Sequence, residues 1–218
     1  MATVGARHTP EDRTDALARA RLRAALVPDL LIEARRIVST VIAGWHGRRK
    51  RGIGETFWQF RPYVAGETLA AAPLIERLLA DYPDVPLLVT TTTPTGSERV
   101  QALFGDRVTH VYCPWELPTA LTRFMRAFDP QLVIVLETEL WPNLCAAVKR
   151  HGAKLMLMNG RLSEKSYRGY GKLPRLIRPM MARFDALAVQ TRVEAERYMA
   201  LGAWPERVYP IGSVKFDM

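Results

Sequence analysis

Cysteine and long apolar runs are both scarce in this chain of 218 residues. The two cysteines, Cys113 and Cys145, lie far apart without metal-ligand spacing, so neither a disulfide framework nor a cysteine-based metal site is expected. No apolar run reaches the roughly 18 residues that a membrane-spanning helix needs. The amino-terminal residues are charged throughout and lack the apolar core of a secretory signal. These absences predict a protein of a reducing compartment, the cytoplasm.

A glycine-rich nucleotide fingerprint is missing as well. The pattern G-x-G-x-x-G, which marks nicotinamide and flavin sites, does not occur after any expected strand, so such a cofactor has no support. No cluster of residues has the spacing of metal ligands either. We therefore expect neither a cofactor nor a metal.

Acidic residues are fewer than basic ones, 22 against 31, for a net charge of +9. Such a balance suggests an acidic partner, whether phosphate, lipid headgroup or nucleic acid. Up to Glu67 there are twelve basic and seven acidic residues, so this part holds +5 of the +9. Its dense basic run, His46 to Arg51, is more typical of a solvated loop. No nucleic-acid-binding motif accompanies the run, so nucleic acid is not an expected partner.

The stretch LVIVLETELWPN, residues 132–143, carries the most informative pattern. Its five leading apolar residues predict a strand that is buried on both faces of a parallel sheet. Glu137 follows the strand directly, at the sheet edge where ligands of open α/β sheets bind. Trp141-Pro142 then predicts a helix start, because proline is tolerated in a first helical turn. Glu139 has a simpler explanation, since an acid is favoured near a helix amino terminus.

Strands and helices alternate from Thr68 onward. The expected strands are residues 87–89, 108–112, 132–136, 154–158, 186–189 and 207–211. The expected helices are 69–79, one that ends at 103, 118–128, one beyond 141, 163–181 and 193–201. This alternation predicts right-handed βαβ crossovers and therefore an α/β, Rossmann-like parallel sheet.

Residues before Thr68 do not follow this alternation of strands and helices. Helical periodicity over 13–26 and 29–42 predicts two helices, whose apolar stripes favour core or partner-helix packing over a membrane-surface role. The aromatic run from Phe57 is strand-like, but Pro62 argues against a central strand.

Loops that follow the expected strands hold the other candidate residues. In the first loop, Thr93, Thr95, Gly96 and Ser97 offer hydroxyls and an amide to an anion or a sugar, although side-chain chemistry alone favours the simpler explanation that Thr95 or Ser97 caps the next helix. Another loop, residues 159–163, brings Asn159 and Arg161 to the same edge and ends with a serine cap at Ser163. Lys215 follows the last strand, where it could meet a developing negative charge.

Five motifs occur together in a characteristic order: GETLAAAPLI (66–75), TTTTPTGSERV (90–100), ETELWPN (137–143), NGRLSEKSYRGY (159–170) and GSVKFD (212–217). Together they resemble the amino-terminal domain of the 3-deoxy-D-manno-octulosonic acid (Kdo) transferases, from about Gly66 to Met218. The resemblance implies the amino-terminal half of a GT-B glycosyltransferase, in which two Rossmann-like domains face a cleft.

By the same resemblance, the reaction is metal-free and inverting, and it transfers Kdo from CMP-Kdo to the lipid A precursor in lipopolysaccharide biosynthesis. Glu67 matches the family's catalytic base, and Glu137 and Lys215 match its two positions that stabilise the transition state. A carboxylate base is chemically reasonable here if its surroundings raise its pKa toward neutrality. The family also implies peripheral contact with the cytoplasmic face of the inner membrane.

The chain departs from the family pattern in two places. It ends at Met218, where the second domain of the family is expected to begin, so that we expect no donor domain and little activity from the isolated chain. Residues 29–67 resemble instead the start of an uncharacterised bacterial family associated with von Willebrand factor A modules. We therefore expect a helical, basic segment of different origin over 1–67 and the Rossmann-like domain over 68–218. A non-catalytic module that binds the acceptor lipid or docks a partner is the alternative.

Overall fold

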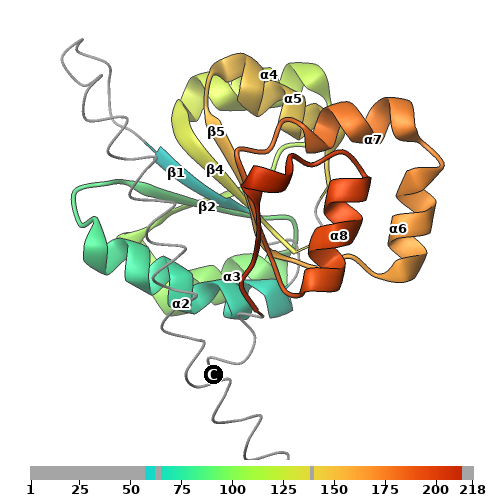
Figure 1. Cartoon of the computed structure of the whole chain (residues 1–218). Helices are drawn as coiled ribbons and strands as arrows, with labels where there is room; N and C mark the ends of the chain where they lie inside the picture. Colours follow the sequence, from blue (N-terminus) through green and yellow to red (C-terminus); the bar gives the residue numbers. More distant parts are fainter. Residues whose placement is uncertain (1–56, 62–64, 138–139, 213–218) are drawn as a thin grey trace, which may run out of the picture.

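The computed structural model describes residues 57–61, 65–137 and 140–212, with side chains from Ala71 onward (Figure 1). In this part of the chain, seven parallel strands form one sheet in the order β3-β2-β1-β4-β5-β6-β7. The strands are β1 (Phe57–Arg61), β2 (Leu87–Thr91), β3 (Thr109–Tyr112), β4 (Pro130–Leu136), β5 (Lys154–Gly160), β6 (Ala186–Val189) and β7 (Val208–Pro210).

Helices connect these strands and cover both faces of the sheet. The α-helices are α2 (Ala65–Asp81), α3 (Pro94–Phe104), α4 (Pro118–Phe128), α5 (Pro142–His151), α6 (Glu164–Gly171), α7 (Pro174–Met181) and α8 (Arg192–Ala200). Figure 1 shows α2 and α3 on one face of the sheet, with α4 and α5 on the other. The predicted α/β, Rossmann-like parallel sheet is therefore confirmed.

Strand β4 explains why both faces are covered. Its side chains alternate between the two faces, as in any strand. Val133 and Val135 pack with α4, α5, α7 and α8 in one apolar cluster, whereas Leu132 and Ile134 pack with α2 and α3 in the other. Because apolar residues are needed on both sides, the strand appears in the sequence as an unbroken apolar run.

Strand β1 corrects one expectation. It lies between β2 and β4, at the centre of the described sheet, although Pro62 argued against a central strand. The described strand ends at Arg61, so Pro62 is not one of its residues. The expected boundary between residues 67 and 68 falls inside α2. The different origin of residues 1–67 stays a prediction, and the helices expected over 13–26 and 29–42 lie outside the described residues.

The segment 163–181 differs from the expected secondary structure. A single helix was expected, but the chain forms α6 and α7 with a break at Lys172 and Leu173. Pro174 begins α7 and disfavours helical geometry at the residue before it. Leu173 accordingly has φ −121° and ψ 53°, outside the helical region.

Candidate functional site

Because all seven described strands are parallel, their carboxyl ends meet at one edge of the sheet, here called the carboxyl edge. The strand order reverses between β1 and β4, and ligands of open α/β sheets bind at such a switch point. Arg61 at the end of β1 pairs with Val135, two positions before Glu137. Glu67 lies in the first turn of α2, which begins soon after β1. The topology thus places the backbone of both predicted acids at the switch point.

Glu137 directly follows β4, as predicted, and has a strained backbone. Its φ is 57°, in the left-handed region that residues other than glycine rarely adopt. Its N–H donates to the carbonyl of Met158 on β5, at 2.9 Å. The side chain is half-buried, and its Oε1 atom is fully buried. Strain of this kind persists only where the surrounding structure fixes it, and it is frequent at functional sites.

Asn159 occupies the equivalent place on the neighbouring strand β5. Its φ is 53° and its side chain is 1% exposed. Gln190, which follows β6, donates through Nε2 to Asn159 Oδ1 at 3.0 Å. The sequence analysis missed Gln190, although its place directly after a strand was a usable signal. The hydrogen bond from Gln190 therefore fixes the side chain of Asn159 to the end of the neighbouring strand β6.

The loop after β2 forms the amino terminus of α3. Thr93 is the N-cap, and its Oγ1 accepts from the N–H of Gly96 at 3.1 Å. Capping by Thr95 or Ser97 was expected, so this expectation is wrong. The helix begins earlier because Pro94 fits the first helical position. Gly96 is buried, and an added Cβ would lie 3.1 Å from Thr91 Cβ.

His110 on β3 joins this loop to the next strand and was not predicted. Its Nε2 lies 3.0 Å from Thr91 Oγ1, and its Nδ1 lies 3.5 Å from Ser97 Oγ. Thr91 Oγ1 also donates to the carbonyl of Thr93 at 3.4 Å. A consistent network therefore has His110 donating from Nε2 and accepting at Nδ1, as a neutral imidazole. Burial lowers the pKa of His110, in agreement with that state.

Glu116, in the loop after β3, caps the helix that follows Glu137. Its Oε1 accepts from the backbone N–H of Asn143 at 2.7 Å and of Leu144 at 2.9 Å. Its Oε2 accepts from Asn143 Nδ2 at 2.8 Å. The predicted helix start at Pro142 is confirmed, but its carboxylate cap comes from a residue that no local pattern indicated. Adjacent Trp115 is 84% exposed at the carboxyl edge.

The loop that carries Arg161 is fastened to α8. Arg197 Nη1 donates to the carbonyl of Leu162 at 2.7 Å, and Tyr198 OH donates to that of Arg161 at 3.4 Å. The Arg161 side chain is exposed. Ser163 caps α6 by accepting from the N–H of Ser166 at 3.1 Å, as expected. The structure thus presents Arg161 from a fixed loop at the carboxyl edge.

The structure leaves some candidates without a position. Lys215 and Glu139 lie outside the described residues, and the side chain of Glu67 is not described. Substrate binding by Thr93, Thr95, Gly96, Ser97, Asn159 and Arg161 stays a prediction. In the described part of the chain, no group of three or more His, Cys, Asp or Glu is placed to hold a metal ion. No helix within the described ranges is long and apolar enough to span a membrane.

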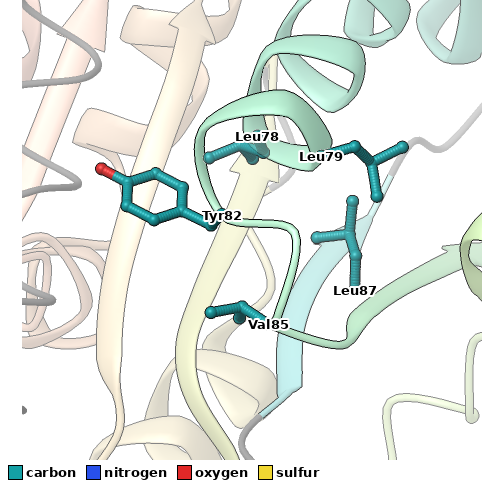
Figure 2. A pocket seen from close by; sticks show the side chains of 5 residues that line it. All are labelled: Leu78, Leu79, Tyr82, Val85 and Leu87. Atoms are coloured by element: carbon teal, nitrogen blue, oxygen red, sulfur yellow. The ribbon is translucent and has the colours of Figure 1, made fainter.

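An apolar pocket lies away from this edge (Figure 2). It lies between the end of α2 and the start of β2, and it is lined by Leu78, Leu79, Tyr82, Val85 and Leu87. Figure 2 shows the Tyr82 hydroxyl directed away from the other labelled side chains. Its position at the amino ends of the strands and its apolar lining separate it from the candidate site.

The parallel sheet and its strand order define a Rossmann-like α/β domain, a fold shared with solved sugar-nucleotide epimerases. A solved UDP-GlcNAc 2-epimerase from Neisseria meningitidis matches with a TM-score of 0.56 and 16% identity, over 74% of this chain and 48% of that chain. Another UDP-N-acetylglucosamine 2-epimerase matches with a TM-score of 0.52 and 14% identity, over 71% of this chain and 47% of the other. At such low identity, these matches show the fold alone.

Sequence comparison gives the family. Residues 47–218 match the 3-deoxy-D-manno-octulosonic-acid transferase (kdotransferase) family, and the chain belongs to it. A 3-deoxy-D-manno-octulosonic acid transferase from Haemophilus influenzae is 41% identical over 153 residues, which cover 70% of this chain and 36% of the relative. One from Bordetella pertussis is 35% identical over 159 residues, covering 70% of this chain and 36% of the relative.

These matches also bear on the extent of the family resemblance. The family match begins at residue 47, before the expected boundary between residues 67 and 68. The resemblance of residues 29–67 to a second family stays a prediction. The chain spans little more than a third of the length of these curated relatives, 36% in both cases.

Proposed function

We propose that the chain is the acceptor-side domain of a glycosyltransferase that moves Kdo from CMP-Kdo to the lipid A precursor in lipopolysaccharide biosynthesis. The observation that carries this proposal is the position of Glu137. It is a half-buried acid with a left-handed backbone, at the switch point of a Rossmann-like sheet, in a chain of this family. The cytoplasmic face of the inner membrane is the proposed location.

In the proposed reaction, an acceptor hydroxyl attacks the anomeric carbon of Kdo. The new C–O bond forms as the bond from that carbon to the phosphate oxygen breaks, and its electron pair leaves with CMP. Glu67 takes the hydroxyl proton as general base. Glu137 and Lys215 stabilise the transition state, and the lysine offsets negative charge on the leaving phosphate or the Kdo carboxylate. Attack opposite the leaving group inverts the anomeric centre.

Arg161 is the proposed contact to a phosphate of the acceptor. It is exposed at the carboxyl edge, and its loop is fixed to α8 by Arg197 and Tyr198. A guanidinium suits this task because it can donate two parallel hydrogen bonds to one phosphate. Thr95 and Ser97 are proposed to contact sugar hydroxyls from the start of α3.

Most donor contacts are proposed to come from a second domain, as the family resemblance implies. The 218 residues alone should therefore bind the acceptor without turnover. The test measures binding of the lipid A precursor in detergent micelles, and Kdo transfer in the same samples by mass spectrometry. We expect saturable binding and no Kdo product. Binding no stronger than that of a phospholipid of equal charge would overturn the assignment.

A matched pair of variants locates that binding. Arg161→Ala should weaken acceptor binding by about tenfold, the range of a lost charge-assisted hydrogen bond. Arg150→Ala is the control, because Arg150 is equally an exposed arginine but lies at the end of α5, on the opposite edge of the sheet. Equal losses in the two variants would show that only overall charge matters and would contradict a site at the carboxyl edge.

A further inference from the structure

The apolar pocket at the amino ends of the strands, here called the amino-edge pocket, takes no part in the proposed reaction. Its lining consists of Leu78, Leu79, Tyr82, Val85 and Leu87, and Figure 2 shows the one polar group among them, the Tyr82 hydroxyl, directed away from the others. Its volume of about 180 Å³ lies below the roughly 300–1,000 Å³ of small-molecule sites. The pocket therefore suits apolar side chains of a protein segment rather than a free ligand.

The chain enters the described domain beside this pocket. Strand β1 begins at Phe57, and its second residue, Trp58, pairs with Leu87 of β2. Leu87 is itself part of the pocket lining. The residues that precede β1 are therefore attached to the domain next to one wall of the pocket.

Residues 29–42, DLLIEARRIVSTVI, supply the apolar side chains that such a pocket can take. Their spacing predicts a helix with one apolar stripe, which consists of Leu30, Leu31, Ala34, Ile37, Val38 and Val41. A helix of this length needs a partner surface, because packing of the apolar face supplies most of its stability. The segment itself lies outside the described residues.

The connection between this segment and the pocket is long enough. It consists of residues 43–56, fourteen in number, and an extended chain spans about 3.3 Å per residue, or roughly 45 Å in all. The predicted helix, also of fourteen residues, is about 21 Å long. Tethering through such a linker gives the segment an effective concentration on the order of millimolar. Even a small apolar contact therefore suffices to hold it.

Charge favours the same pairing. Residues 76–84, at the pocket, hold three acids and one base, a net charge of −2. Residues 29–51 hold six basic and two acidic residues, a net charge of +4. Asp84 is exposed, and none of the ion pairs among the described residues includes it. Arg35 is four positions from Leu31, so it flanks the predicted stripe.

We propose that residues 29–42 dock as a helix on the amino-edge pocket of the same chain. The stripe covers the half-buried residues Leu79, Tyr82 and Val85, and Arg35 faces Asp84. A second copy of the chain carries the same stripe, but the tether favours the segment of the same molecule. The inference does not depend on the proposed transfer reaction, because docking requires neither the acceptor nor the donor.

The direct test is photo-crosslinking in the whole chain. Asp84 is exposed next to the pocket residue Val85, so p-benzoylphenylalanine in its place probes the pocket rim and leaves the lining intact. We expect mass spectrometry to find crosslinks to residues 29–42. In an equal mixture of isotope-labelled and unlabelled chains, these crosslinks should join peptides of the same molecule. Glu98, an exposed acid near the start of α3, is the control position and should give no crosslink to this segment.

A matched pair of variants in the segment tests the stripe. Ile37→Asp places a charge in the stripe and should lower the crosslink yield about tenfold, the range expected when one buried aliphatic side chain is lost. Ser39→Asp makes the same charge change on the opposite side of the predicted helix. It should change the yield by about twofold or less, as a surface substitution does.

Trypsin gives a second measurement on the chain without the probe. Docking should slow cleavage after Arg35 and Arg36, because proteolysis requires a locally open backbone. Val85→Asp in the pocket lining should accelerate this cleavage about tenfold. The control Val193→Asp makes the same change on α8, where the side chain is 54% exposed, and should leave the rate unchanged. Slow cleavage within residues 65–212 in both variants would show that the domain stays folded, and Ile37→Asp should accelerate the same cleavage without a change in the pocket.

Three results would overturn the proposal. The first is the absence of a crosslink from position 84 to residues 29–42. The second is a crosslink that joins labelled to unlabelled chains as often as peptides of one molecule, which would assign the pocket to a second copy. The third is an equal effect of Ile37→Asp and Ser39→Asp on the crosslink yield and on the cleavage rate.

Discussion

Glu137, directly after β4, and Asn159, next to last in the neighbouring β5, share a left-handed backbone, at φ 57° and 53°. The Glu137 N–H donates at 2.9 Å to the carbonyl of Met158, the residue just before Asn159. The two strand ends are therefore locked to each other where the candidate site lies. Because Asn159 lies in β5 and the backbone of Glu137 is hydrogen-bonded to that strand, the sheet defines the positions of both residues.

Asn159 provides the first test of this arrangement. Asn159→Ala loses the hydrogen bond from Gln190. It also forces alanine into the left-handed region, which costs about 1–2 kcal/mol for a residue with a Cβ atom. Asn159→Gly loses the same hydrogen bond but adopts that backbone freely. We expect the glycine variant to unfold at higher urea concentration than the alanine variant. Equal midpoints would show that the left-handed backbone carries no cost.

Glu116 is expected to stabilise α5 across 27 residues of sequence. Glu116→Ala removes the acceptor for two backbone N–H groups of the helix, so the free energy of unfolding should fall by about 1–2 kcal/mol. Hydrogen exchange at the Leu144 amide should accelerate in that variant. Glu98→Ala, at an exposed position of α3, is the control and should change stability by less than about 0.5 kcal/mol. Unchanged exchange at Leu144 would contradict the capping role.

His110 should make stability depend on pH. Burial lowers its pKa in the folded protein below 6.5, the ordinary value for histidine, so below that pH the unfolded chain binds the proton more readily than the folded one. The contribution of His110 to the free energy of unfolding is therefore fully present above pH 6.5, and it is lost as the pH falls toward the pKa of the folded state. His110→Gln should remove this slope, and the difference between variant and parent isolates it. An NMR titration that places His110 at or above 6.5 would contradict this interpretation.

Gly160 tests how closely β5 and β6 pack at the edge. An added Cβ would lie 2.9 Å from Leu157 Cδ2 and 3.0 Å from Val189 Cγ1, so Gly160→Ala should destabilise by about 1–3 kcal/mol through overpacking. Gly169 lies in α6 with nothing within 4 Å of the added Cβ. Gly169→Ala should therefore stabilise slightly, by about 0.5–1 kcal/mol. Urea unfolding of the two variants should give shifts of opposite sign, and shifts of the same sign would contradict the close packing.

Sequence reasoning predicted the parallel sheet because buried strands such as β4 are unbroken apolar runs, and it placed Glu137 because a strand end is visible in such a run. It could not place β1 at the centre, since a five-residue aromatic strand before a proline carries little local signal. Glu116 escaped prediction because its partner Asn143 lies 27 positions away, and pairing at that separation depends on the packing of α4 against α5. The left-handed backbone of Glu137 likewise depends on its neighbour strand.

The charge distribution shows a different reason for failure. When the net charge was counted on either side of Glu67, residues 1–67 held +5 of the +9. The bases of α6 and α7 did not show in that count, because acidic residues elsewhere after Glu67 offset them. These bases are contiguous with Leu173 and Leu176 in residues 161–183, so a charge count over a shorter window would have shown them. A total over a long segment therefore concealed a local surface.

The central claim is that the carboxyl edge is the acceptor site. The most direct measurement is hydrogen–deuterium exchange of the whole chain with and without the lipid A precursor in micelles. We predict protection at the loops 92–97, 137–141 and 159–163, with no change at the amino-edge pocket around Leu78 and Leu87. Protection confined to that pocket, or the same protection from micelles without the precursor, would contradict the claim.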